Sequence, residues 1–105
     1  ARVLAPVLEL LHDAYAENLN LERMAAVADL TPFQLIGAFN RTIGLTPHAY
    51  LTQLRIRAAI GHLAAGRPLT DAAIASGFYD QSALTRHFKR TFGMTPLQYV
   101  RARKG

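Results

Sequence analysis

The chain has 105 residues, of which 50% are hydrophobic, enough for one domain or for two small lobes that share a core. It contains no cysteine, which excludes a disulfide framework and a thiolate metal site. No apolar run reaches the ~20 residues of a transmembrane helix. The first residues carry Glu9 and Asp13 within an amphipathic pattern, which is unlike a signal peptide. We therefore expect a cytoplasmic protein.

Charge is distributed unevenly along the chain. Residues 1–30 hold two Arg against five Asp or Glu, a balance of −3, whereas residues 31–105 hold ten Lys or Arg against two Asp, a balance of +8. The net charge of +5 is thus a basic body with an acidic N-terminal cap. This asymmetry favours a polyanionic partner, although charge alone does not identify one.

Helical patterns begin at the N-terminus and continue through the first half. Apolar residues at helical spacing predict a first helix over residues 2–17. Asn20 can cap a short second helix. Thr31-Pro32 combines a hydroxyl cap with a proline at the first helical position, and it begins a third helix that Gly44 ends.

The same signals recur in the second half. Thr46-Pro47 begins the longest helix, about residues 47–65, whose apolar surface is wider than one stripe. A short helix near 70–76 and a turn at 77–79 follow, and then a helix near 80–92 that Asp80 caps and Gly93 stops. Thr95-Pro96 begins the last helix. The sequence predicts an all-α fold of about seven helices without strands.

Two segments of the chain repeat each other. Residues 21–51 match residues 69–100, first at an offset of 48 and, after one extra residue in the second copy, at an offset of 49. Each copy holds a short helix, a tight turn and a longer helix, at about 21–43 and 69–92. This is the helix-turn-helix pattern, in which the second helix is held against the major groove of DNA. Two such lobes on the linker helix 47–65 predict two similar surfaces for a repetitive partner.

The longer helix of the second copy leaves polar side chains on its outer face. Arg can make two hydrogen bonds to the edge of guanine, and Gln can make two to the edge of adenine. Basic residues one turn later on the helix can contact phosphates. The predicted base-reading residues are Gln81, Ser82, Ala83, Thr85 and Arg86, and the predicted phosphate contacts are Lys89 and Arg90.

The first copy departs from this pattern. Aligning the copies places Gly37 opposite Arg86 and Ile36 opposite Thr85, so the arginine that would reach a guanine is missing. We therefore predict that the second motif supplies most of the base-specific reading, and that the first is its weaker partner. The first copy's candidate base readers are Phe33, Gln34, Ile36 and Gly37, and its candidate phosphate contacts are Thr31, Asn40 and Arg41.

The segment GFYDQSALTRHFKRTFGMTPLQY resembles the second helix-turn-helix of the AraC/XylS family of bacterial transcription regulators. The resemblance continues upstream through Tyr50-Leu51, Arg55-x-x-Ala58 and LERMAAVADLTPFQL, and it covers essentially the whole chain. It implies promoter DNA as partner, with two helices in successive major grooves. It further implies RNA polymerase as a candidate partner, a nucleoid-associated location and an effector-sensing or dimerising domain outside this chain. The start in mid-helix without methionine also favours a fragment of a longer regulator.

Other interpretations stay open at this point. Phe33 is either a wedge against the duplex or a residue of lobe packing. His87 is either a phosphate contact or a residue that packs between the lobes, and Arg86 could instead pair with Asp80. A basic helical protein-interaction module is the main alternative function. Enzyme function has little support, because titratable groups are not clustered, and no cofactor or metal is expected from the scattered histidines His12, His48, His62 and His87.

Overall fold

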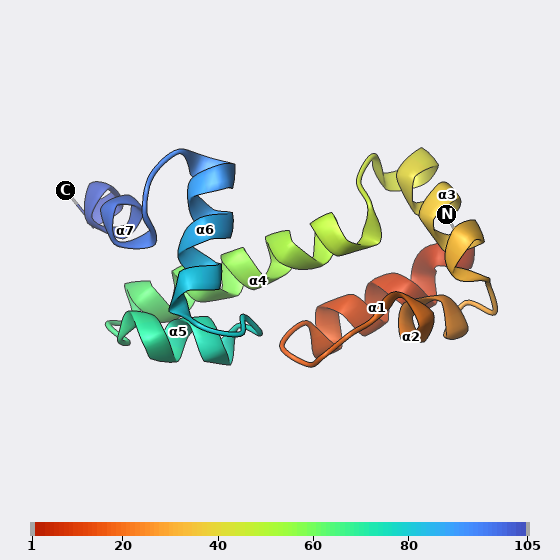
Figure 1. Ribbon diagram of the computed structural model, residues 1–105, viewed down its shortest axis with the longest axis horizontal. Helices are drawn as coiled ribbons and strands as arrows, with labels where there is room; N and C mark the ends of the chain where they lie inside the picture. Colours follow the sequence, from red (N-terminus) through yellow and green to blue (C-terminus); the bar gives the residue numbers. More distant parts are fainter. Residues whose placement is uncertain (1, 105) are drawn as a thin grey trace. The chain divides into compact units, whose positions relative to one another are not determined.

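The computed structural model describes residues 2–104, and within them it holds seven α-helices, one short 3-10 helix and no strand (Figure 1). The predicted all-α fold of about seven helices is confirmed. The helices divide between two compact units, the first ending at Leu54 and the second beginning at Arg55. Each unit is built around its own buried cluster.

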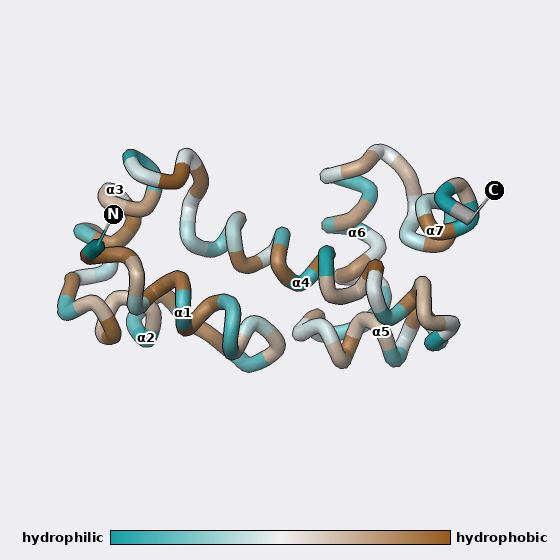
Figure 2. The backbone as a smooth tube through the Cα atoms, turned by 180° about the vertical axis from the view of Figure 1, so that it is seen from behind, coloured by the Kyte–Doolittle hydropathy of each residue, from teal (hydrophilic) through white to brown (hydrophobic). Residues whose placement is uncertain are grey.

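The first unit contains the 3-10 helix η1 (Arg2–Leu4), α1 (Ala5–Ala14), α2 (Leu21–Ala26), α3 (Pro32–Ile43) and the start of α4 (Pro47–Ala64). Apolar and polar stretches alternate along α1, as an amphipathic helix requires (Figure 2). Helix α2 packs against both α1 and α3. The hydrophobic core cluster of this unit consists of Leu4, Val7, Leu11, Ala14, Leu19, Met24, Ala25, Leu35, Phe39 and Leu51.

The first helix, predicted over roughly residues 2–17, is helical from Arg2 but ends earlier, at Ala14. The first turn is the 3-10 helix η1, and the α-helix begins only at Ala5, next to Pro6. Pro6 has no backbone N–H to donate to the Arg2 carbonyl, so an α-helical hydrogen bond cannot form at this point of the first turn. At the other end, the Glu17 N–H bonds the Ala14 carbonyl over three residues at 3.0 Å, so the chain leaves the helix in a turn.

The second unit contains the rest of α4, then α5 (Leu69–Ala75), α6 (Gln81–Phe92) and α7 (Pro96–Lys104). Helix α6 packs against both α5 and α7. The hydrophobic core of the second unit forms two adjoining clusters, and Leu69 and Tyr99 pack at the edge of both. The buried members of the clusters are Ile56, Ala59, Leu63, Ala72, Ala73, Phe78, Leu84, Phe88 and Val100.

The sequence repeat is also a repeat of packing. The rings of Phe39 and Tyr50 meet edge to face in the first unit, 5.5 Å apart at 76°. Their counterparts Phe88 and Tyr99 meet in the second unit at 5.4 Å and 72°. Such edge-to-face pairs contribute about 0.5–1.5 kcal/mol beyond their buried area. The two copies therefore use the same aromatic pair to hold the longer helix of each motif.

Local capping chemistry sets the helix ends as predicted. Asn20 accepts a hydrogen bond from the Arg23 N–H, Thr31 from the Gln34 N–H and Asp80 from the Ala83 N–H. Gly44 (φ 86°) and Gly93 (φ 73°) end α3 and α6 in the left-handed conformation that glycine adopts without a steric penalty.

The tight turns of the two motifs share a further feature. Gly77 has φ 100°, and the aligned residue of the first copy, Asp29, has φ 56°. Aspartate tolerates this region better than most side chains because its short polar group can bond nearby backbone. The two turns thus have related backbone conformations although only one contains glycine. Among residues 2–104, no helix is long and apolar enough to cross a membrane.

Candidate nucleic-acid interface

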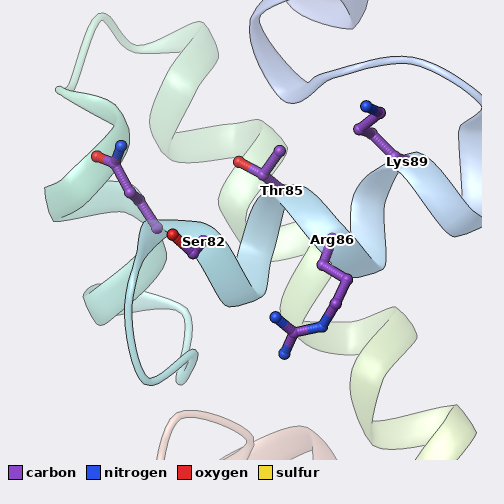
Figure 3. Close-up of a pocket in the computed structure, with 5 residues that line it drawn as sticks. Ser82, Thr85, Arg86 and Lys89 are labelled. Carbon is purple, nitrogen blue, oxygen red and sulfur yellow. The ribbon is translucent and has the colours of Figure 1, made fainter.

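Helix α6 separates its buried and exposed residues cleanly. Leu84 and Phe88 are fully buried, which leaves the opposite side of the helix to solvent. The side chains that project there line a hollow of about 590 Å³ (Figure 3): Gln81, Ser82, Thr85, Arg86 and Lys89. Four of the five predicted base readers of this helix, together with one predicted phosphate contact, are therefore brought together on one surface.

The cations of this surface are not neutralised by carboxylates. Among residues 2–104 an ion pair joins Arg23 to Glu17 at 3.2 Å, and no ion pair involves Arg86, Lys89 or Arg90. The alternative pairing of Arg86 with Asp80 does not form, because the Asp80 carboxylate caps α6 by accepting from the Ala83 N–H at 2.8 Å. Arg86, Lys89 and Arg90 are exposed. The outer side of α6 thus presents positive charge and hydrogen-bond donors.

Ala83 lies differently from the other predicted base readers of α6. It is half-buried, it packs against the core of the second unit, and its N–H is occupied by Asp80. His87 is also half-buried, with its ring 5.9 Å from that of Phe78 in a tilted arrangement. This contact lies within the second unit, whereas the interpretations of the sequence are a phosphate contact or packing between the lobes.

Both predicted glutamines already hold a hydrogen bond through the side-chain oxygen. Gln34 Oε1 accepts from the Thr31 N–H at 3.0 Å, which completes a capping box with the Thr31 hydroxyl. Gln81 Oε1 accepts from the Thr70 hydroxyl at 2.6 Å, which ties α6 to α5. Forking onto adenine uses the amide oxygen and nitrogen together. These bonds therefore orient the amides and reduce their freedom to read a base.

Helix α3 buries Leu35 and Phe39, and its exposed side carries both apolar and polar side chains. Phe33 is 86% exposed and Ile36 is 40% exposed. Phe33 is therefore not a core residue. Its exposure argues against lobe packing and favours the interpretation as a wedge against the duplex. Gly37 is half-buried, whereas the predicted phosphate contacts Thr31, Asn40 and Arg41 are exposed.

One exposed aromatic residue beside α6 was not among the predicted site residues. Tyr79, in the turn that precedes α6, is 91% exposed. The signal was present in the alignment of the two copies: Leu30 matches Phe78 at one offset and Thr31 matches Asp80 at the next, so Tyr79 is the extra residue. Tyr79 is thus an inserted, solvent-facing aromatic residue next to the helix that carries the predicted base readers.

Arg55 of α4 belongs to a different environment. It is half-buried, and desolvation lowers the pKa of its guanidinium below the usual value. Its neighbour Arg57 is exposed. In the part of the chain that the structure describes, no three His, Cys, Asp or Glu side chains are placed to hold a metal ion.

The two short-helix, turn and long-helix units define a protein with tandem helix-turn-helix motifs. Comparison with known families agrees, since residues 24–102 match a family described as a helix-turn-helix domain. The chain belongs to the AraC family of this class.

Relatives support the assignment over nearly the whole chain. A Streptomyces antibioticus protein described as an AraC-like transcription regulator is 35% identical over 98 residues, which cover 92% of this chain and 32% of the relative. The chain spans about a third or less of the length of the curated relatives that it matches.

Solved structures share the fold. The DNA-binding domain of the transcriptional factor AdpA, crystallised with a target DNA, superposes with a TM-score of 0.87 at 27% identity, covering 94% of this chain and 90% of that one. The C-terminal domain of AraT, a response regulator from Geobacillus stearothermophilus, superposes with a TM-score of 0.90 at 22% identity, covering 97% and 86% respectively.

Proposed function

We propose that this chain binds double-stranded promoter DNA sequence-specifically and regulates transcription, with α3 and α6 entering successive major grooves. The observation that carries the proposal is the outer side of α6, where Ser82, Thr85, Arg86 and Lys89 line one surface without a carboxylate partner. The AdpA DNA-binding domain, which has the same fold and is 27% identical, was crystallised with a target DNA, which supports the same partner here. The role is binding rather than catalysis.

Helix α6 supplies most of the base-specific reading in this proposal. Arg86 donates to a guanine edge, while Ser82 and Thr85 offer hydroxyl groups to neighbouring bases. Gln81 contributes through its amide nitrogen, since its oxygen is held by Thr70. Ala83 contributes at most an apolar contact through its half-exposed methyl group. Lys89 and Arg90 contact phosphates and position the helix without reading sequence.

Helix α3 is the weaker reader. Its exposed Phe33 and Ile36 suit apolar contact with thymine methyl groups. Gln34 offers its amide nitrogen, because its oxygen completes the capping box. Thr31 and Asn40 contact phosphates. The sequence predicts a phosphate contact for Arg41 as well, but its side chain folds back along α3 over Gly37, which points to a different role.

The whole regulator has further partners in this proposal. The acidic N-terminal part, with Glu9 and Asp13 exposed, is a candidate surface for RNA polymerase or for an effector-sensing domain outside this chain. Charge reversal of these two residues should change transcription in a reporter assay while DNA binding stays intact. Unchanged transcription would argue against this surface as a contact.

The proposed function is tested by selecting bound duplexes from a random DNA library with the 105-residue chain at moderate salt. We expect enrichment of two half-sites about one helical turn (~10 bp) apart, because the motifs repeat. Binding should weaken steeply as salt rises, because each phosphate contact releases a counterion. No enrichment together with no salt-sensitive binding would reject the proposal and favour a basic protein-interaction module.

A further inference from the structure

We propose that α3 reads a base edge with the guanidinium of Arg41, and that Gly37 is the residue that positions it. This inference rests on the proposed DNA-binding function and deepens it. Position 37 aligns with Arg86, the main candidate reader of α6, so α3 lacks an arginine where α6 has one. The structure brings a guanidinium to that place from one turn further along the helix.

The contact between Gly37 and Arg41 is direct. A Cβ atom on Gly37 would lie 3.1 Å from Nη1 of Arg41 and 3.9 Å from its Cζ. Ordinary contacts of a Cβ atom lie at 3.4–4 Å, so the guanidinium occupies space that any other residue at 37 would contest. Long side chains on helices point back toward the N-terminus, which brings the head group of residue 41 over residue 37. Arg41 is exposed.

The matching residue of the second copy shows why the glycine matters. Arg41 aligns with Arg90, and Arg90 has Arg86 four residues before it. A second guanidinium there repels a cation folding back over it, so we expect Arg90 to extend away from Arg86 and to contact phosphate instead. In α3 the glycine removes both the side chain and the repulsion. The guanidinium of Arg41 then lies on the side of α3 that also carries the exposed Phe33 and Ile36.

A guanidinium held against the helix is suited to a base edge. Its planar fork can donate two hydrogen bonds to guanine O6 and N7, and an ammonium cannot reproduce that geometry. In addition, a glycine on the groove-facing side lets the helix backbone approach the DNA closely. These features distinguish Arg41 from a phosphate contact, for which charge alone is sufficient.

The test uses the 105-residue chain and competition binding to single-base-pair variants of the selected duplex. The half-site of α6 is the one that Arg86→Ala relaxes, and the other half-site belongs to α3. We expect both Arg41→Ala and Arg41→Lys to lose at least about fivefold discrimination in the α3 half-site. The matched control is Arg90→Ala, which should weaken binding to every duplex by the same factor.

Gly37→Ala separates positioning from folding. The added methyl group displaces the tip of a flexible side chain, so we expect discrimination in the α3 half-site to fall. The thermal unfolding midpoint should stay the same or rise, because alanine favours helix over glycine. Unchanged discrimination in Gly37→Ala would overturn the positioning role.

Two further results would overturn the base-reading role of Arg41. One is uniform weakening by Arg41→Ala across all duplexes, and the other is full discrimination by Arg41→Lys, since both describe a phosphate contact. In either case Arg86→Ala would still relax its own half-site, and the proposed function would stand. Absence of salt-sensitive, sequence-selective binding by the unmodified chain would instead reject the function itself.

Discussion

Removing Gln34 and removing Arg86 should have opposite consequences for stability and for DNA reading. Gln34 occupies the third position of α3, where its oxygen accepts from the Thr31 N–H at 3.0 Å. Arg86 is exposed and makes no ion pair among the described residues. Gln34 is therefore primarily a capping residue and Arg86 primarily a reader, although sequence reasoning placed both among the base readers.

The expected losses of stability and of sequence discrimination follow from these contacts. Gln34→Ala leaves the Thr31 N–H without its partner, and loss of one capping interaction costs about 0.5–1 kcal/mol of unfolding free energy. For a domain of this size that lowers the unfolding midpoint by about 2–8 °C. Sequence discrimination should change by less than about threefold, because a single amide donor cannot fork onto a base. Arg86→Ala should leave the midpoint unchanged and cost about 1–3 kcal/mol of discrimination, or roughly 5- to 150-fold.

Two assays separate the variants: thermal unfolding followed by circular dichroism, and competition binding to duplexes that differ by one base pair. Gln34→Glu is the matched control, since its carboxylate keeps the capping acceptor and favours the helix N-terminus. It should restore the midpoint and weaken binding to all DNA by charge repulsion. If Gln34→Ala loses more discrimination than Arg86→Ala, the assignment of α6 as the main reader is refuted.

Three further predictions concern separate features of the second unit. Lys89→Ala should weaken binding to all duplexes equally and lower the slope of log affinity against log salt by about 0.9, measured by salt titration; unequal losses would make Lys89 a base reader. Gly77→Ala should cost about 1–2 kcal/mol because φ is 100°, whereas Gly77→Asp should cost less because aspartate holds the aligned position at 29; equal losses in denaturant titrations would contradict this. Ser76→Ala should keep or raise the unfolding midpoint, since the buried Ser76 hydroxyl has no hydrogen-bond partner among the described residues. A loss of more than about 1 kcal/mol of unfolding free energy would contradict this and show that the hydroxyl is hydrogen-bonded.

The sequence by itself determined where most helices begin and end. Each capping residue acts on the turn of helix next to it, so its effect can be predicted from its neighbours along the chain. This holds for Thr31-Pro32, Asp80, Gly44 and Gly93. The repeat likewise identified the two motifs, because equivalent positions in the two copies have equivalent packing roles, as the pairs Phe39–Tyr50 and Phe88–Tyr99 show.

The tertiary structure decided which polar side chains remain available to a ligand. Gln81 lies on the predicted outer surface, yet its oxygen is bonded to Thr70, eleven residues away on another helix. Ala83 falls against the core, although its position in the motif suggested a reader. Gly37 has no side chain with which to read a base, but in the folded chain the guanidinium of Arg41 lies over it. Helix signals are local and can be read one turn at a time, whereas the availability of a donor or acceptor depends on what the folded chain places beside it.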